Sequence, residues 1–134
     1  MLTIKQKQLD TIIEQSFALH PIEACGVISG LIGSDNPLTV IPMDNSAKSE
    51  TFFRFCSKQQ LKVWREMDEH DHEVIVFYHS HTNSRAYPSK EDIKFSIPGK
   101  SHHLIVSTDQ NSHGEIRSYR FVNGRAVEET LKII

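Results

Sequence analysis

The chain has 134 residues, of which 38% are hydrophobic and 24% charged, and its formal net charge is −2. This length and composition predict one globular domain, residues 1–134, with enough apolar side chains to form a core. The near-neutral charge argues against a protein that binds nucleic acid by neutralising phosphates. No run of about 20 apolar residues could span a membrane, and the start of the chain is unlike a signal peptide. We therefore expect a cytoplasmic protein whose partners are neither nucleic acids nor membranes.

The first part of the chain predicts a helix followed by a β-hairpin. Apolar residues recur at helical spacing in residues 3–19, where Thr3 can cap the helix and Pro21 stops it. The short apolar run 24–32 is typical of a strand. The Gly-Ser-Asp-Asn-Pro sequence after it indicates a turn, and residues 38–42 then return as an antiparallel partner.

The remaining chain predicts a central buried strand among mixed elements. Residues 74–78 are five strand formers in a row, which is typical of a strand buried on both faces. The other predicted elements are strand 51–56, helix 57–70 with Leu61, Trp64 and Met67 on its buried face, helix 89–97 ended by Pro98-Gly99, and strands 103–107, 115–122 and 126–133. The fold class is therefore mixed α/β, with a largely antiparallel sheet flanked by helices.

Two histidines at the end of the central strand are the first candidate for chemistry. His79 and His81 point to the same face if the strand stays extended to His81, because strand side chains alternate. Two imidazoles placed in this way can bind one metal ion, and zinc is the usual guest of imidazole combined with a carboxylate. Asp92, in the first turn of the next helix, is the best third ligand.

The same residues also have a purely structural interpretation. The segment from Ser89 to Asp92 has the pattern of a capping box, in which the serine and the acidic residue close the helix N-terminus. The other histidines, His103 among them, are expected to be structural. What favours a metal site is the joint pattern of His-x-His at a strand end followed by Ser-x-x-Asp.

This pattern resembles the signature of the JAMM (MPN+) metalloproteases. His79-Ser80-His81, then seven residues, Ser89, two residues and Asp92 match the family motif, and Glu23 stands where the family has its upstream glutamate. The order of predicted elements matches over essentially the whole chain. The resemblance implies the JAMM/MPN fold, with layers similar to those of cytidine deaminases.

The resemblance also implies a role for each matching residue. His79, His81 and Asp92 would bind one Zn²⁺ per chain, Glu23 would be the general base, and Ser89 would steady the oxyanion. Ser80, between the histidines, points to the other face and is expected to make a structural hydrogen bond. Asn45 is first of all a turn former that could also line the substrate groove.

Sequence wording such as EACGV and YHSHT is similar to the stand-alone bacterial members of the family. The best known of these acts on a ubiquitin-like sulfur-carrier protein and releases cysteine from its C-terminal Gly-Gly in cysteine biosynthesis. A carrier of this kind is thus the expected substrate. The alternatives within the family are broader removal of ubiquitin-like modifiers from lysines, or a non-catalytic MPN interaction module.

Two rival chemistries are disfavoured by the residues. A zinc nucleobase deaminase requires H-x-E and P-C-x-x-C, and the chain has neither. Cys25 and Cys56 form no C-x-x-C pair, so we expect both to be reduced in buried strands. A thiol protease using Cys25 remains an alternative without support from the local sequence.

Overall fold

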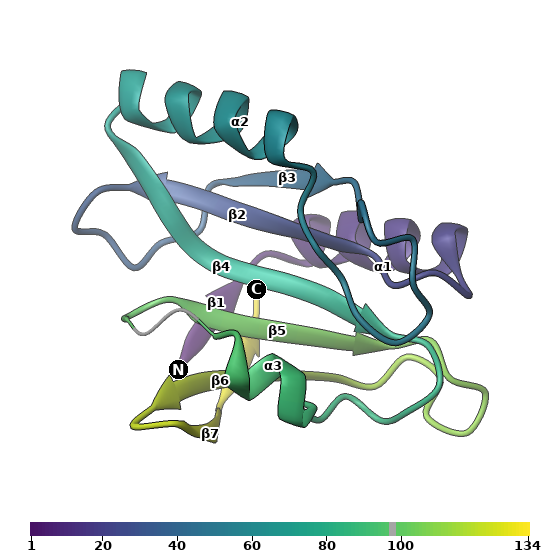
Figure 1. The fold of residues 1–134 in the computed structure, drawn as a ribbon. Helices are drawn as coiled ribbons and strands as arrows, with labels where there is room; N and C mark the ends of the chain where they lie inside the picture. Colours follow the sequence, from purple (N-terminus) through teal and green to yellow (C-terminus); the bar gives the residue numbers. More distant parts are fainter. Residues whose placement is uncertain (97–98) are drawn as a thin grey trace.

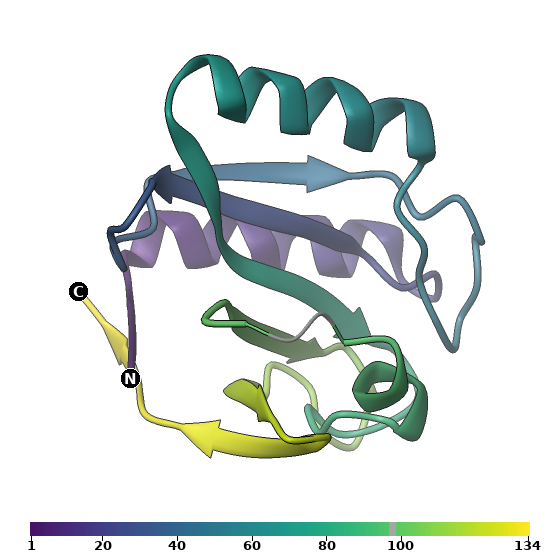
Figure 2. The same cartoon turned by 60° about the vertical axis from the view of Figure 1, so that its left-hand side comes forward.

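The computed structural model describes residues 1–96 and 99–134. A six-stranded sheet in the order β3-β2-β4-β5-β6-β7 forms its centre, with α1 and α2 on opposite faces (Figures 1 and 2). Neighbouring strands are antiparallel except β4 and β5, which are parallel. This arrangement confirms the predicted fold class. The elements are β1 (Leu2–Ile4), α1 (Gln6–Leu19), β2 (Cys25–Leu31), β3 (Thr39–Met43), α2 (Ser57–Glu69), β4 (His72–His81), α3 (Lys90–Lys94), β5 (His102–Ser107), β6 (Ile116–Val122), β7 (Arg125–Glu129) and β8 (Leu131–Ile133).

The two faces of the sheet bury different clusters. Under α1, Leu9 and Ile12 pack with Tyr78 and with other side chains of the central strands. Under α2, Val63 and Met67 pack against the other face of β2. Because side chains alternate along β4, Tyr78 faces α1, whereas its neighbours Phe77 and His79 face the α2 side. The candidate histidines therefore project from the α2 face.

The predicted helix start at Thr3 is wrong. Residues Leu2–Ile4 form β1, which pairs in parallel with β8 as a separate two-stranded sheet, and the helix begins at Gln6. Leu2 and Ile4 are both fully buried, and they alternate with the half-buried Thr3. Three residues are too few for this strand alternation to be separated from helical periodicity in the sequence.

The predicted strand 51–56 is also wrong. This segment is a loop with a single bridge between Phe55 and Asn45. Its aromatic residues Phe53 and Phe55 pack against the cluster under α2, so they anchor a loop instead of facing a ladder partner. Cys56 consequently lies at the N-cap of α2, half-buried, and not in a buried strand as expected.

Three further elements differ in detail from expectation. Leu61 is exposed, and Val63 takes its expected place on the buried face of α2. The C-terminal segment expected as one strand divides at Thr130, where β8 leaves the large sheet to pair with β1. The helix predicted over 89–97 ends at Lys94 and buries none of its residues, and Ile97 and Pro98 lie outside the described residues.

Within the described residues, no helix has the length and apolar character to cross a membrane.

Candidate active site

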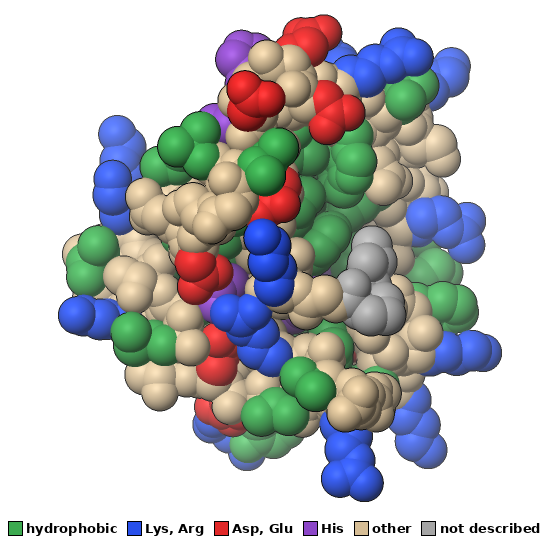
Figure 3. Space-filling model, turned by 90° about the vertical axis from the view of Figure 1, so that its left-hand side faces the viewer, with side chains coloured by type: hydrophobic (Ala, Val, Ile, Leu, Met, Phe, Trp, Pro, Cys, Tyr) green, Lys and Arg blue, Asp and Glu red, His purple; other side chains and the backbone are tan. Residues whose placement is uncertain are grey.

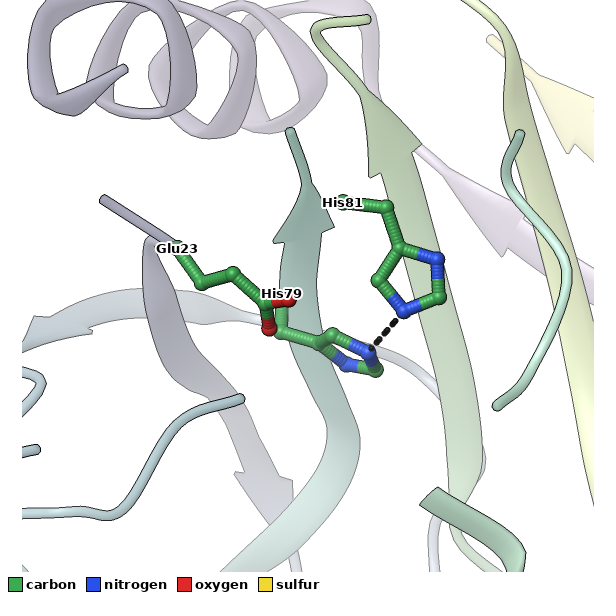
Figure 4. Close-up of side chains that lie close together, drawn as sticks. All are labelled: Glu23, His79 and His81. Atoms are coloured by element: carbon green, nitrogen blue, oxygen red, sulfur yellow. Dashed lines mark hydrogen bonds between the residues drawn. The ribbon is translucent and has the colours of Figure 1, made fainter. Parts of the chain in front are cut away.

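β4 runs on to His81, so both histidines belong to one extended strand. Their side chains lie on the same face and are almost completely buried. The Nε2 atoms of His79 and His81 are 3.1 Å apart (Figure 4). Cys25 is the register partner of His79 on β2, which brings the start of β2 beside the two imidazoles.

Asp92 completes this group from a different element. The loop after β4 folds back, and the first turn of α3 places the Oδ2 atom of Asp92 3.2 Å from Nε2 of His79 and 3.0 Å from Nε2 of His81. The structure therefore brings together the three residues that the sequence proposed as metal ligands.

Ser89 acts as the N-cap of α3. Its hydroxyl accepts a hydrogen bond from the backbone N–H of Asp92 at 3.0 Å, and its own N–H donates to Oδ2 of Asp92 at 2.9 Å. This is a complete capping box. The capping interaction and the position near the two histidines are therefore compatible, because the cap itself directs the carboxylate of Asp92 toward the imidazoles.

Glu23 precedes β2 and is buried beside the histidines, with 3% of its surface exposed. The ligand atoms of Glu23, His79 and His81 all lie within 4.8 Å of one another, and the side chains point toward a common centre (Figure 4). Its Oε1 atom is buried and makes no hydrogen bond with the described residues. Burial raises the pKa of Glu23 to about 8, and the nearby carboxylates of Asp92 and Glu91 also raise it, whereas His81 lowers it. Such an unpaired buried carboxyl oxygen is unusual in a folded protein, and it makes Glu23 a candidate functional residue.

The donor atoms fit a bound metal ion. Their separations of 3.0–3.2 Å are close to the edge of about 3.3 Å expected for ligands in a tetrahedron around zinc. The Nδ1 atom of His81 donates to the carbonyl of Arg85 at 3.0 Å, which leaves the lone pair of Nε2 free for a metal. A carboxylate oxygen of Glu23 lies within 4.8 Å of the ligand atoms of both histidines, as a group that contacts a metal-bound ligand would.

The pKa shifts of two of the three donors favour the same interpretation. Burial lowers the pKa of His79, which keeps its imidazole neutral. Burial alone would raise the pKa of Asp92, but the two histidines and the N–H of Ser89 outweigh it and lower that pKa. A neutral imidazole and an ionised carboxylate are the forms in which these side chains bind metals. For His81, burial would lower the pKa, but the hydrogen bonds to Asp92 and to the carbonyl of Arg85 outweigh it and raise that pKa.

Ser80 joins the two halves of this arrangement. Its hydroxyl accepts from the N–H of Ala24 at 2.8 Å, and its own N–H donates to the carbonyl of Ala24 at 2.9 Å. The predicted structural hydrogen bond of Ser80 is thereby confirmed. The residue between the two histidines holds the residue after Glu23, so the sequence motif and the upstream glutamate are connected directly.

A cleft of about 510 Å³ opens beside His79 and Asp92. Its floor is a row of rings across the sheet, in which His103 lies 5.5 Å from Phe77 and 4.3 Å from Phe121 between ring centroids. Hydrophobic side chains line a hollow on the face shown in Figure 3. The walls come from the loop before α2, from α3 and from the residues directly after α3, and they consist of Phe52, Phe53, Arg54, Phe55, Glu91, Phe95 and Ser96.

The sequence analysis did not predict this cleft, nor that His103 lines it between Phe77 and Phe121. The run of three phenylalanines within residues 52–55 was a usable signal, but it reads equally as a strand. His103 has the pattern of an ordinary strand residue, and only the strand pairing of β5 with β4 places it opposite Phe77. Nothing in the local sequence indicates that contact.

The chemistry of Cys25 disfavours the thiol-protease alternative. Its side chain is fully buried, and its thiol lies 3.6 Å from the carbonyl of Met43. Burial, with smaller effects of Asp44 and Glu23, raises the pKa of Cys25 to about 12. A reactive cysteine requires a lowered pKa and access, and Cys25 has neither.

Comparisons with known proteins agree with this geometry. The family model of prokaryotic homologs of the JAB domain matches residues 5–122. The CysO-cysteine peptidase of Mycobacterium tuberculosis, and that of Mycobacterium bovis, is 42% identical over 134 residues, covering 100% of this chain and 92% of the relative.

Solved structures show the same fold at lower identity. A protein of Desulfitobacterium hafniense, DSY2949, superposes with a TM-score of 0.84 at 24% identity, covering 100% of this chain and 93% of the other. A structure described as JAMM, a metalloprotease-like zinc site in the proteasome and signalosome, superposes with a TM-score of 0.62 at 22% identity, covering 100% and 98%. The chain therefore belongs to the prokaryotic JAB family of JAMM/MPN proteins, and the curated relatives that share its full length are peptidases.

Proposed function

We propose that the protein is a zinc-dependent peptidase that cleaves the peptide or isopeptide bond after the C-terminal Gly-Gly of a ubiquitin-like sulfur-carrier protein, releasing cysteine or another C-terminal adduct in the cytoplasm. The observation that carries the proposal is the buried, unpaired carboxyl group of Glu23 beside the converging donor atoms of His79, His81 and Asp92. The full-length similarity to CysO-cysteine peptidase supports the proposed substrate class.

In this proposal His79, His81 and Asp92 hold the metal, and Glu23 and Ser89 carry out the proton transfer and charge stabilisation. A bound zinc ion would supply an activated water at neutral pH and polarise the scissile carbonyl. Glu23 takes the proton of the attacking water and gives it to the leaving amine.

Ser89 has one proton free for this task. Its hydroxyl oxygen accepts from Asp92, which leaves the hydroxyl hydrogen available to donate to a developing oxyanion. The capping bond thereby fixes the oxygen while the hydrogen stays free to rotate.

We assign the aromatic cleft to the carrier's tail on the acyl side of the scissile bond. The leaving amine must lie near Glu23, which returns the proton to it. Among the described residues, the cleft lining contains His79 and Asp92 but not Glu23, so it leads away from the leaving-group side. The narrow Gly-Gly would lie beside the metal ligands, and the residues before it would fill the cleft.

The test is mass spectrometry of sulfur-carrier proteins that end in Gly-Gly-Cys, incubated with enzyme with and without a chelator. We expect loss of the mass of one cysteine, and no loss once the metal is removed. Carriers joined through Gly-Gly to a lysine side chain form the second arm. If the lysine-linked carriers are cleaved faster, the function is broad removal of modifiers from lysines and not release of a C-terminal cysteine. If neither substrate is cleaved, the proposed function is contradicted.

The cleft assignment has its own test. Phe95 lines the cleft with 74% of its surface exposed, so Phe95→Ala should leave the fold intact. Losing part of its burial against the tail costs about 1 kcal/mol, which corresponds to an increase in KM of about fivefold. The control is Leu61→Ala on the outer face of α2, also exposed and apolar. An unchanged KM in Phe95→Ala would contradict the assignment of the cleft to the tail of the carrier.

A further inference from the structure

The backbone of Glu23 lies outside the sheet, so its N–H and C=O groups have no hydrogen-bond partners in the strand ladders. Glu23 precedes β2, whose register pairs begin at Cys25. Its buried N–H and C=O groups therefore need partners from elsewhere. The N–H donates to the carbonyl of Ser49 at 2.9 Å, and the C=O accepts from the side-chain amide of Asn45 at 3.1 Å. Both groups are thus fixed by the segment between β3 and α2.

Asn45 uses its entire hydrogen-bonding capacity at this place. Its Nδ2 donates to the carbonyls of Glu23 and Phe52, at 3.1 and 3.0 Å. Its Oδ1 accepts from the N–H groups of Ala47 and Arg54, at 3.0 and 3.1 Å. An amide offers two donor and two acceptor sites, and all four are occupied. The residue is buried, with only 8% of its surface exposed.

These partners fall into two groups with different tasks. Glu23 carries the proposed general base, and Phe52 and Arg54 belong to the wall of the aromatic cleft. One NH₂ group connects them, because its two hydrogens go to Glu23 and to Phe52. The side chain of Asn45, with all its hydrogen bonds made, therefore connects the proposed tail site to the proposed general base.

Resting on the proposed function, we propose that Asn45 is a positioning residue, which fixes Glu23 at the scissile bond and ties its position to the wall of the cleft. Misplacing a reacting group by about 1 Å can cost about 100-fold in rate. The role is assigned to the donation from Nδ2, because the acceptor bonds of Oδ1 serve only the loop itself.

The decisive variant is Asn45→Asp, which keeps both acceptor bonds and the side-chain shape but loses both donations. We expect kcat for carrier–cysteine cleavage to fall at least about tenfold, with a smaller change in KM and an unchanged zinc content. Two controls separate positioning from loop stability. Ser46→Ala removes a hydroxyl bond to the carbonyl of Arg54 in the same loop, and Thr82→Val removes the bond that ties Glu50 of the loop to the end of β4. We expect kcat to change little in Ser46→Ala, and less in Thr82→Val than in Asn45→Asp.

A second readout does not depend on turnover. Hydrogen exchange at the amide of Glu23 should accelerate in Asn45→Asp, because the segment that accepts its bond is loosened, and should be unaltered in Ser46→Ala. Three outcomes would each overturn the proposal. The first is a wild-type kcat in a folded Asn45→Asp protein, and the second is a loss of kcat in Thr82→Val as large as that in Asn45→Asp. The third is an unchanged rate of hydrogen exchange at the amide of Glu23. If the wild type cleaves no carrier adduct, the proposed function fails, and the exchange measurement still decides the role of Asn45.

Discussion

Two clusters that combine histidine and carboxylate side chains differ in the direction of their polar atoms. The convergent cluster consists of Glu23, His79, His81 and Asp92, whose donor atoms point at one centre. The saturated cluster consists of Asp35, His102, Ser118, Arg120 and Glu129. Their residue types are alike, but only the convergent cluster retains an unpaired buried oxygen among the described residues.

The direction of the bonds explains the difference. In the saturated cluster the two ring nitrogens of His102 point to opposite partners, Glu129 at 2.6 Å and Asp35 at 2.8 Å, so they cannot bind one ion together. Glu129 also accepts from the hydroxyl of Ser118 at 2.8 Å. Every capacity is used within the protein, as is usual for buried polar groups. The two clusters are therefore distinguished by whether their donor atoms converge on one centre, and not by the types of residue that they contain.

The largest expected effect is in the convergent cluster. Glu23→Gln should lower kcat by about 100- to 10,000-fold, the range of general acid–base catalysis, because the amide cannot accept the proton. Zinc content, measured by atomic absorption, should stay at one ion per chain, since the proposed ligands remain. Retained turnover in the variant would remove the general-base role from Glu23.

Loss of a ligand should remove the metal itself. His81→Ala is expected to bind zinc far more weakly and to lose activity, because the imidazole supplies one of three protein ligands. Adding zinc at about 100 times its Kd should stabilise the wild type by about 2.7 kcal/mol, visible as a raised Tm, and should not stabilise the variant equally. The same experiment on a His102→Gln variant sharpens the comparison, since its zinc response should match that of the wild type. Full zinc occupancy in His81→Ala would contradict the ligand set.

In the saturated cluster the expected effect is on stability alone. The side chain of Glu129 is 8% exposed and accepts charge-assisted hydrogen bonds from His102 and Arg120. Glu129→Gln should therefore lower the free energy of unfolding by about 2 kcal/mol, with kcat and zinc content unchanged. Urea unfolding at pH 7 measures the first quantity. A loss of activity without a loss of stability would mean that the two clusters are coupled.

The stabilisation by Glu129 should depend on pH with a defined sign. Burial by itself would raise the pKa of Glu129, but hydrogen bonds from His102, from the N-terminal amine and from Ser118 lower it from 4.5 to about 2. A carboxyl group with a depressed folded-state pKa contributes stability that is present above 4.5 and is lost as the pH falls through about 2. The stability difference between wild type and Glu129→Gln should narrow between these pH values. A constant difference would exclude this linkage.

Much of the convergent cluster could be foreseen from the sequence. His79 and His81 could be placed on one strand face from periodicity alone, and Asp92 could be placed in the first turn of a capped helix. The resemblance to a family motif added Glu23. These inferences succeed because alternation and capping are local rules that a short stretch of chain obeys by itself.

The parts that could not be foreseen depend on pairing between distant segments. The phenylalanines of residues 52–55 have the composition of a strand, but Asn45 binds the carbonyl of Phe52 and the N–H of Arg54 that a ladder would need. Leu2 and Ile4 become a strand only because β8 returns to pair with them. The saturated cluster likewise joins residues from four separate places in the chain. No local pattern specifies such contacts.

The smallest expected effect concerns the most exposed member of the saturated cluster. Asp35 is bonded to His102, but 65% of its side chain is exposed, so water and salt screen the interaction. Asp35→Asn should lower the free energy of unfolding by about 0.5 kcal/mol or less, far below the effect of Glu129→Gln. Urea midpoints at low and high salt measure this, and the small difference should vanish at high salt. An effect as large as that of Glu129→Gln would mean that the exposed charge of Asp35 stabilises the fold as much as the hydrogen-bonded carboxylate of Glu129 does.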